Sequence, residues 1–202
     1  MKHIFCLIVL SFGMLALPLI AVAQTKVQNI PQTTAQNLVA ERCAWEELFP
    51  DGLINAKGEA IPVHAIEGRL VGIYFSGHWC PDCRRFSPRL VAFRNLNKAE
   101  FEVVMVSYDK SEPELFNYMT TFNMEWFALK WKSAPAEALK DKFQVKNIPM
   151  LVVVAENGKV VTTEGVPDVQ NAPETCLQAW KAMAQEPTPP PATPSATTTT
   201  AE

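Results

Sequence analysis

Two cysteines separated by two residues, Cys80 and Cys83, are the side chains of this chain most suited to chemistry. Such a pair can cycle between a dithiol and a disulfide, and it can also supply half of a zinc site. The pair lies in residues 79–83, Trp-Cys-Pro-Asp-Cys, between the apolar run 69–75 and a helical pattern over 84–98. Because the apolar run predicts a short buried strand, we expect the cysteines on a strand-to-helix turn. Redox chemistry is the first hypothesis.

Thiol exchange requires a thiolate nucleophile, a second thiol to resolve the mixed disulfide, and a surface that holds the substrate chain. If Cys80 is the helix N-cap and Pro81 the first helical residue, free backbone amides and the helix dipole stabilise a thiolate on Cys80. Cys83 then lies inside the first turn, where we expect it to be more buried and to act as the resolving thiol. Trp79 either flanks the sulfur with a flat apolar face or is simply a packed residue.

Two titratable neighbours act on the thiolate in opposite directions. The carboxylate of Asp82 opposes a second negative charge between the sulfurs, whereas a protonated His78 favours it. The sequence therefore leaves open whether the pair works as a reductant or as an oxidant. His78 is either a general base or a partly exposed residue at the rim of a loop.

Ile148-Pro149 precedes a predicted strand that begins at Met150. X-Pro bonds can adopt the cis form at low cost, particularly where a turn enters a strand. A proline that faces the cysteines would leave neighbouring backbone groups free to pair with an extended substrate peptide. The alternative is a proline that only marks the start of a strand.

The composition suits one soluble globular domain with extra segments: 202 residues, 48% hydrophobic, 19% charged and a formal charge of −3. Nothing in it suggests nucleic-acid binding. Residues 1–23 have the layout of a cleavable secretory signal, with an uncleaved membrane anchor as the alternative. The chain is therefore expected to be exported, to a periplasm or to the outside. Residues 24–37 are expected to be flexible, 38–186 to form the domain, and the Pro/Thr-rich 187–202 to be a disordered tail.

Four cysteines follow the predicted signal, in a compartment where disulfides can persist. Besides Cys80 and Cys83 these are Cys43 and Cys176, in the predicted first and last helices. A structural disulfide between Cys43 and Cys176 is one interpretation, and two buried free thiols are the other. We expect no metal site, because the remaining candidate ligands have no recognised spacing.

Alternating apolar runs and helical patterns predict an α/β layer fold in which helices cover a central sheet. The runs on either side of Asn157-Gly158 predict an antiparallel hairpin, and Ser111 is placed to cap a helix. Helices are expected at 38–49, 84–98, 112–121, 136–143 and 173–184, strands at 70–75, 101–107, 150–155 and 159–163, and a small hairpin over 52–64.

Three stretches together resemble the thioredoxin superfamily, and in particular its tryparedoxin and nucleoredoxin branch. They are residues 74–84 (Tyr-Phe-Ser-Gly-His-Trp-Cys-Pro-Asp-Cys-Arg), 101–107 (Phe-Glu-Val-Val-Met-Val-Ser) and 147–153 (Asn-Ile-Pro-Met-Leu-Val-Val). The similarity spans about 53–163 and includes Pro88, where thioredoxins carry a proline that kinks the helix.

The resemblance implies a thioredoxin-like fold with a central mixed sheet flanked by helices. It implies Cys80 as nucleophile, Cys83 as resolving cysteine, and Pro149 as the cis-proline facing them, with the Ile148 backbone helping to hold substrate. The redox-active disulfide would then serve in place of a bound cofactor.

Three residues depart from the family pattern. Tyr74 stands where thioredoxin proper has a buried acidic residue, so no group is assigned to transfer a proton to Cys83. Asp82 replaces the second proline of a tryparedoxin-like Cys-Pro-Pro-Cys, and Met150 replaces the Thr that often follows the cis-proline. Since tryparedoxins use a dedicated thiol as reductant, an exported relative would need a membrane-bound or small-thiol electron donor.

These observations predict an exported thiol:disulfide oxidoreductase that reduces disulfides of other exported proteins. A disulfide oxidase or isomerase is the rival within the same class. A non-catalytic binding module that uses its Pro/Thr tail as a tether is the rival from another class.

Overall fold

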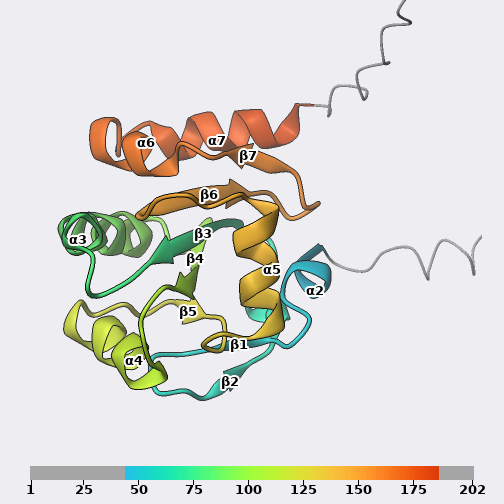
Figure 1. The fold of residues 1–202 in the computed structure, drawn as a ribbon. Helices are drawn as coiled ribbons and strands as arrows, with labels where there is room; N and C mark the ends of the chain where they lie inside the picture. Colours follow the sequence, from blue (N-terminus) through green and yellow to red (C-terminus); the bar gives the residue numbers. More distant parts are fainter. Residues whose placement is uncertain (1–43, 187–202) are drawn as a thin grey trace, which may run out of the picture. The chain divides into compact units, whose positions relative to one another are not determined.

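The computed structural model describes residues 44–186 (Figure 1). The predicted signal, flexible segment and tail, at 1–23, 24–37 and 187–202, lie outside the described residues. Within the described part of the chain, no helix is both long and apolar enough to cross a membrane. The elements are α2 (Ala44–Leu48), β1 (Leu53–Ile54), β2 (Ala60–Ile61), the 3₁₀ helix η1 (Val63–Ile66), β3 (Leu70–Ser76), α3 (Pro81–Leu96), β4 (Phe101–Ser107), α4 (Glu112–Thr121), β5 (Phe127–Ala128), α5 (Ala134–Lys142), β6 (Met150–Val154), β7 (Val160–Thr162), α6 (Gly165–Asn171) and α7 (Cys176–Gln185).

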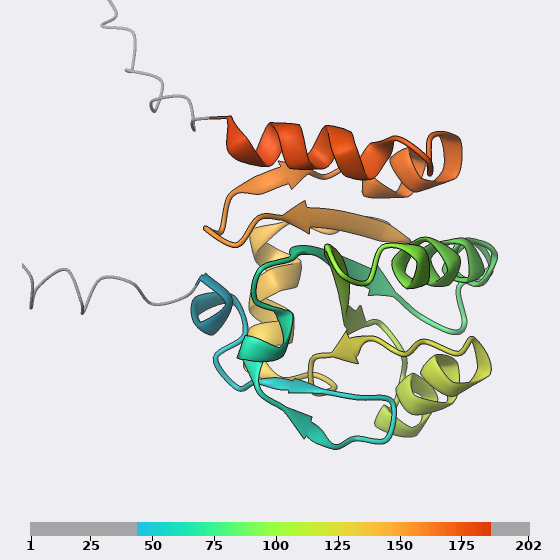
Figure 2. The same cartoon turned by 180° about the vertical axis from the view of Figure 1, so that it is seen from behind.

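The strands form one mixed sheet in the order β2-β1-β5-β4-β3-β6-β7. β3 pairs with β4 in parallel from Leu70↔Phe101 to Ser76↔Ser107, and β4 pairs in parallel with β5. β6 and β7 add antiparallel strands at one edge, and β1 and β2 do so at the other. Figure 2 shows α6 and α7 lying along the β6–β7 edge. The predicted central mixed sheet flanked by helices is confirmed.

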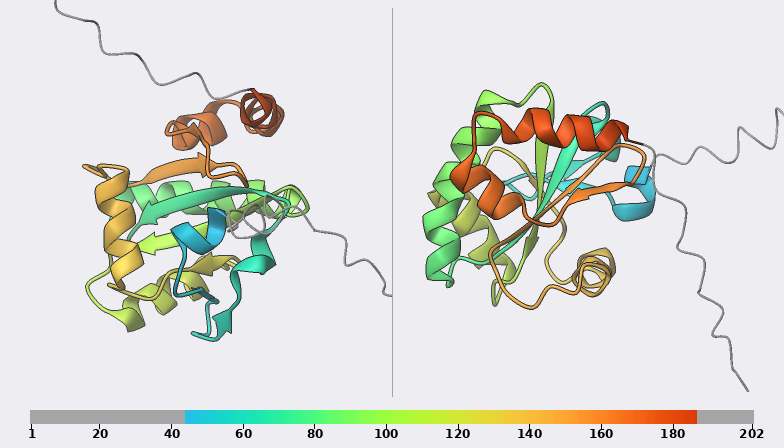
Figure 3. Two further views of the ribbon diagram at one scale, coloured as in Figure 1. Left: turned by 90° about the vertical axis from the view of Figure 1, so that its right-hand side faces the viewer. Right: turned by 90° about the horizontal axis from the view of Figure 1, so that it is seen from above.

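Both faces of the sheet are covered, which explains why β3 reads as a continuous apolar run. Tyr74 of β3 packs on the face covered by α3, α4, α6 and α7. Its neighbours Ile73 and Phe75 pack on the opposite face, against α2, η1 and α5. The two views in Figure 3 show helices on both sides of the sheet. The β3–α3 connection is therefore held between two packed layers, which fixes the position of the cysteine pair.

Several predicted element boundaries differ from the structure. The expected helix 84–98 begins earlier, at Pro81, and the helix expected at 136–143 begins at Ala134. Ser111 occupies the N-cap position of α4, but its side chain makes no capping hydrogen bond. Of the expected helix 38–49, the described part is α2, and residues 38–43 lie outside the described residues.

The prediction of one last helix over 173–184 is wrong at its start, because α6 precedes α7 and the chain turns between them. Ala172 leaves the helical region, with φ −142° and ψ 47°, and Pro173 cannot donate a helix hydrogen bond. The helical pattern of α6 was obscured by Gly165, a poor helix former. A Cβ at Gly165 would lie 2.7 Å from the Leu151 carbonyl oxygen, so the glycine permits α6 to pack closely on β6.

Candidate active site

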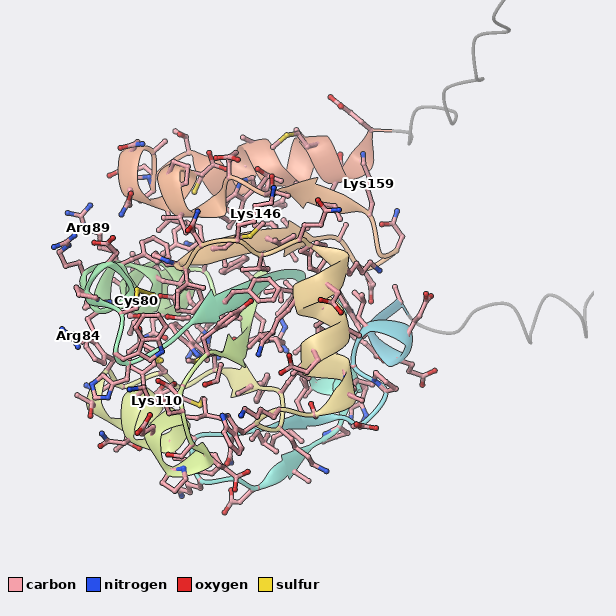
Figure 4. The ribbon with its side chains drawn as sticks, viewed as in Figure 1. Cys80, Arg84, Arg89, Lys110, Lys146 and Lys159 are labelled. Carbon is pink, nitrogen blue, oxygen red and sulfur yellow. A yellow bond between two sulfur atoms is a disulfide. The ribbon has the colours of Figure 1, made fainter. Side chains whose placement is uncertain are left out.

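Cys80 and Cys83 lie where β3 ends and α3 begins, as the sequence predicted (Figure 4). Cys80 is the N-cap residue, with extended backbone angles of φ −82° and ψ 118°, and Pro81 is the first helical residue. The Cys83 backbone N–H donates to Cys80 Sγ over 3.2 Å. The two residues form a disulfide with a Cα–Cα separation of 5.2 Å. The sulfur of Cys80 thus takes the place that a side-chain oxygen takes in an ordinary helix cap.

The two sulfurs differ in their access to solvent. Cys83 is fully buried, whereas Cys80 is 5% exposed and lines a groove. The groove has a volume of about 240 Å³, and its other lining residues are Trp79, Tyr108, Val145, Lys146, Asn147 and Ile148. Trp79 is 52% exposed, so it presents a large apolar surface beside Cys80. A partner that approaches through this groove reaches Cys80 before Cys83.

The Ile148–Pro149 peptide bond is cis and leads directly into β6. This turn places the Ile148 carbonyl oxygen 3.6 Å from Cys80 Sγ. A disulfide sulfur carries no proton, so this contact can become a hydrogen bond only in the reduced thiol. The structure therefore brings Cys80 next to Ile148, the first residue of the cis-proline turn, although almost seventy positions separate the two in the sequence.

The loop after β4 fixes the turn that carries the cysteines. The His78 backbone N–H donates to Asp109 Oδ1 over 2.6 Å, and Trp79 Nε1 donates to the Tyr108 carbonyl oxygen over 2.8 Å. Ser107 Oγ donates to the other oxygen of Asp109. Burial raises the pKa of the Asp109 carboxyl, while the hydrogen bonds from His78 and Ser107 oppose that rise. Sequence reasoning missed Asp109, whose only signal is its place two residues after the end of the buried strand β4.

His78 is partly buried at the rim of the site, and its imidazole packs on aromatic rings. The ring stacks on Tyr118, with centroids 5.1 Å apart, and meets Phe122 edge-on. Its carbonyl oxygen accepts a hydrogen bond from the Arg84 guanidinium over 2.9 Å. Within residues 44–186, no hydrogen bond joins the imidazole to either sulfur, and a role as general base stays a prediction.

Asp82 lies between the cysteines in sequence but in solvent in the structure. Its side chain is 63% exposed and forms an ion pair with Arg85, whose side chain is 77% exposed. Solvent and the adjacent guanidinium both screen the carboxylate. Its effect on the sulfurs is therefore smaller than the sequence spacing alone suggests.

A cluster of buried hydroxyl groups lies behind Cys83. Ser87 Oγ donates to the Cys83 carbonyl oxygen over 3.0 Å and lies 3.0 Å from the Tyr74 hydroxyl and 2.7 Å from the Tyr118 hydroxyl. Ser76 Oγ lies 3.1 Å from the same Tyr118 oxygen. Burial raises the pKa of Tyr74 and of Tyr118, so both phenols remain protonated at neutral pH. The sequence singled out Tyr74 alone, because the cluster forms only when Ser87 of α3 and Tyr118 of α4 meet Tyr74 and Ser76 of β3.

Of the predicted pair Cys43 and Cys176, the structure describes only Cys176, because Cys43 lies outside the described residues. Cys176 is buried and has no disulfide partner among residues 44–186. Burial and the nearby Asp168 carboxylate raise the pKa of the Cys176 thiol to about 11. The disulfide between Cys43 and Cys176 stays a prediction.

Comparisons with known proteins agree with this geometry. A family model described as thioredoxin-like matches residues 68–160. The thioredoxin structure from Wuchereria bancrofti is 39% identical with a TM-score of 0.56, over 64% of this chain and 93% of that one. Tryparedoxin II from Crithidia fasciculata is 33% identical with a TM-score of 0.60, over 65% of this chain and 90% of that one.

Longer curated relatives match as well. Mouse nucleoredoxin is 34% identical over 131 residues, which are 63% of this chain and 30% of the mouse protein. The chain thus spans less than a third of the length of the curated nucleoredoxins it matches.

Proposed function

The chain belongs to the thioredoxin superfamily, with tryparedoxins and nucleoredoxins among its relatives, and from this premise we propose that it reduces disulfides in other proteins. One observation carries the proposal: Cys80, at a helix N-cap, is bonded to the fully buried Cys83 and opens onto a groove. A buried structural disulfide would need no such opening.

In the proposed reaction the Cys80 thiolate of the reduced protein attacks one sulfur of the substrate disulfide. The substrate's other sulfur leaves as a thiolate, and a mixed disulfide joins Cys80 to the substrate. The Cys83 thiolate then attacks Cys80 Sγ, releases the second substrate thiolate and forms the Cys80–Cys83 disulfide. Two electrons pass to the substrate, and the two protons of the dithiol end on its thiols.

The helix start supports Cys80 as the nucleophile. The Cys83 N–H that already points at Cys80 Sγ would stabilise a thiolate there, together with the dipole of the sixteen-residue α3. Trp79, Ile148 and Pro149 are proposed to hold the substrate chain, because Trp79 and Ile148 line the groove and Pro149 sets the turn beside it.

The protein must be recharged by a dithiol or thiol donor after each turnover. One relative, tryparedoxin II, has been solved in complex with glutathionylspermidine. We propose a membrane-bound dithiol or a different small thiol for this chain. The motivation is the expected export signal at 1–23, which would place the protein outside the cytosol. Isolation of the mature protein and sequencing of its N-terminus would test the export part, since an intact residue 1 in the cytosol contradicts it.

Reduction of insulin disulfides, with dithiothreitol as donor, tests the activity directly. The parent protein should accelerate precipitation of the insulin chains, and Cys80→Ser should fall to the rate of dithiothreitol alone. Equal rates for the two proteins would refute the proposal and favour a binding module.

The redox potential separates reductase from oxidase. Equilibration with glutathione should place the potential near about −270 mV for a reductase, whereas a value near about −120 mV would indicate an oxidase. Cys83→Ser, expressed in the native compartment, should accumulate mixed disulfides with protein substrates through Cys80.

A further inference from the structure

We propose that the groove beside Cys80 selects protein disulfides whose flanking residues are acidic. The inference rests on the proposed function and adds a substrate class to it. Three cationic side chains carry it: Arg84 of α3, Lys110 of the β4–α4 loop, and Lys146 of the α5–β6 loop. All three are exposed. Figure 4 labels them together with Cys80.

Lys146 and Arg84 contact the groove or the cysteine turn, and Lys110 is next in sequence to a residue that does. Lys146 lines the same groove as Cys80. Arg84 is held against the turn by the hydrogen bond from its guanidinium to the His78 carbonyl oxygen. Lys110 follows Asp109, whose carboxylate accepts the His78 amide hydrogen bond. Lys146 thus lies at the groove itself, and Arg84 and Lys110 belong to the two segments that hold the cysteine turn.

Two acidic groups nearby are matched by cations of their own, whereas Asp141, whose charge acts on Tyr108 of the groove, forms no salt bridge within residues 44–186. Asp82 pairs with Arg85, and Glu137 pairs with Lys140, which also lies over the Tyr108 ring. Asp109 is buried and hydrogen-bonded, so it presents little charge to the groove.

The three cations themselves are not neutralised in this way. Within the described part of the chain, none of Arg84, Lys110 and Lys146 forms a salt bridge. The Glu114 carboxylate accepts a hydrogen bond from the backbone N–H of Lys110 over 3.0 Å. Arg84, Lys110 and Lys146 outnumber Glu114 and Asp141, the carboxylates beside these segments that have no salt bridge among the described residues, although the chain as a whole has a formal charge of −3.

A positive entrance favours approach and binding of negative segments, because charge complementarity raises association rates and disfavours like-charged partners. The groove, at about 240 Å³, admits an extended segment better than a folded surface. The substrate class that fits is a disulfide in an exposed segment, with Asp or Glu within a few residues of the cysteine that Cys80 attacks.

Two disulfide-bridged peptides of equal length test the inference, one with Asp and Glu around its cysteines and one with Lys in the same places. The full chain is used with dithiothreitol as donor, and kcat/KM is measured from the appearance of reduced peptide. We expect the acidic peptide to be preferred by roughly tenfold at low ionic strength. The preference should shrink to about twofold at roughly 0.3 M salt, because the charges are exposed.

Charge-reversal variants show whether these cations cause the preference. Lys110→Glu and Lys146→Glu together should abolish or invert it, and Lys110→Met should reduce it without adding a negative charge. Lys98→Glu is the matched control, because Lys98 is exposed and lies beyond the far end of α3, a helix about 24 Å long. It should leave the preference intact. Circular dichroism confirms that the variants are folded.

The outcomes separate this inference from the proposed function. Equal kcat/KM for the two peptides, or a preference that survives Lys110→Glu with Lys146→Glu, overturns the acidic class but leaves the reductase intact. A higher kcat/KM for glutathione disulfide than for the acidic peptide also overturns it. Failure to reduce any of the three substrates overturns both.

Discussion

Cys80 and Cys176 are both buried cysteines at the start of a helix, yet their surroundings differ. Cys80 is 5% exposed at the N-cap of α3, and Cys176 is 4% exposed as the first residue of α7. The Cys83 N–H points at Cys80 Sγ, and a groove opens beside it. Cys176 Sγ instead lies 4.0 Å from a carbonyl oxygen, that of Pro173.

The comparison shows that a helix N-terminus does not by itself activate a thiol. Amide groups of Leu177 and of Cys176 itself lower the pKa of Cys176, but burial and the Asp168 carboxylate outweigh them, and the pKa rises to about 11. Cys80 differs because its cap hydrogen bond coincides with a second cysteine and an entrance for a partner. Four predictions test this difference, beginning with the largest effect.

Alkylation of the reduced protein should distinguish the two cysteines most strongly. With a pKa of about 11, Cys176 is a thiolate in only about one molecule in a thousand at pH 8. Iodoacetamide should therefore modify Cys80 at least about 100-fold faster than Cys176. Mass spectrometry of the labelled peptides over time measures both rates, in a Cys43→Ser background.

The pH dependence sharpens the same test. The rate at Cys176 should rise about tenfold per pH unit until the pH approaches 11, because deprotonation limits it. The rate at Cys80 should level off at a lower pH. Similar alkylation rates and similar pH profiles for the two cysteines would show that the two helix starts affect thiol reactivity equally.

Loss of the hydroxyl cluster behind Cys83 should have the second largest effect. Tyr118→Phe removes the phenol oxygen within 2.7 Å of Ser87 and 3.1 Å of Ser76, and leaves both buried serines short of a partner. Urea unfolding should show a loss of about 1–2 kcal/mol in the free energy of unfolding. Tyr108→Phe is the control, since the Tyr108 hydroxyl makes no hydrogen bond within residues 44–186. If the Tyr118→Phe protein is as stable as this control, the hydroxyl cluster does not contribute to the stability of the site.

Much of this architecture could be predicted because it depends on short stretches of sequence. The two central strands are seven-residue buried segments, and an apolar run of that length is a strong signal. The cysteine turn was predictable because Pro81 marks a first helical position.

The missed parts depend on tertiary contacts. β5 has only two residues, Phe127 and Ala128, and exists because β1 and β4 pair with it on either side. The residues of the hydroxyl cluster come from β3, α3 and α4, so no spacing in the sequence predicts that they meet. The same holds for Asp109, which meets His78 only after β3 and β4 pair.

Removal of the charge beside Cys176 should have a smaller effect. Asp168→Asn abolishes the carboxylate that helps to raise the pKa of Cys176, while an amide oxygen can still accept the hydrogen bond from Trp180 Nε1. Burial remains the larger cause, so alkylation of Cys176 at pH 8 should accelerate by only about two- to fivefold. Glu164→Gln, an exposed change just before α6, is the control. No acceleration would mean that burial alone keeps this thiol inactive.

The smallest effect is expected for the carboxylate that the sequence places between the active cysteines. Asp82 is mostly in solvent and paired with Arg85, and exposed pairs of this kind are worth about 0–1 kcal/mol. Asp82→Asn should shift the redox potential of the Cys80–Cys83 pair by less than about 20 mV, since about 30 mV corresponds to roughly 1.4 kcal/mol. Equilibration with glutathione measures the shift, and Arg85→Gln, which frees the carboxylate, should move the potential by a similarly small amount in the opposite direction.

A shift of several tens of millivolts for Asp82→Asn would mean that the carboxylate acts on the sulfurs despite its exposure. Cys80 and Cys176 would then both be governed by a neighbouring aspartate, and their difference would lie in the groove and the second cysteine alone.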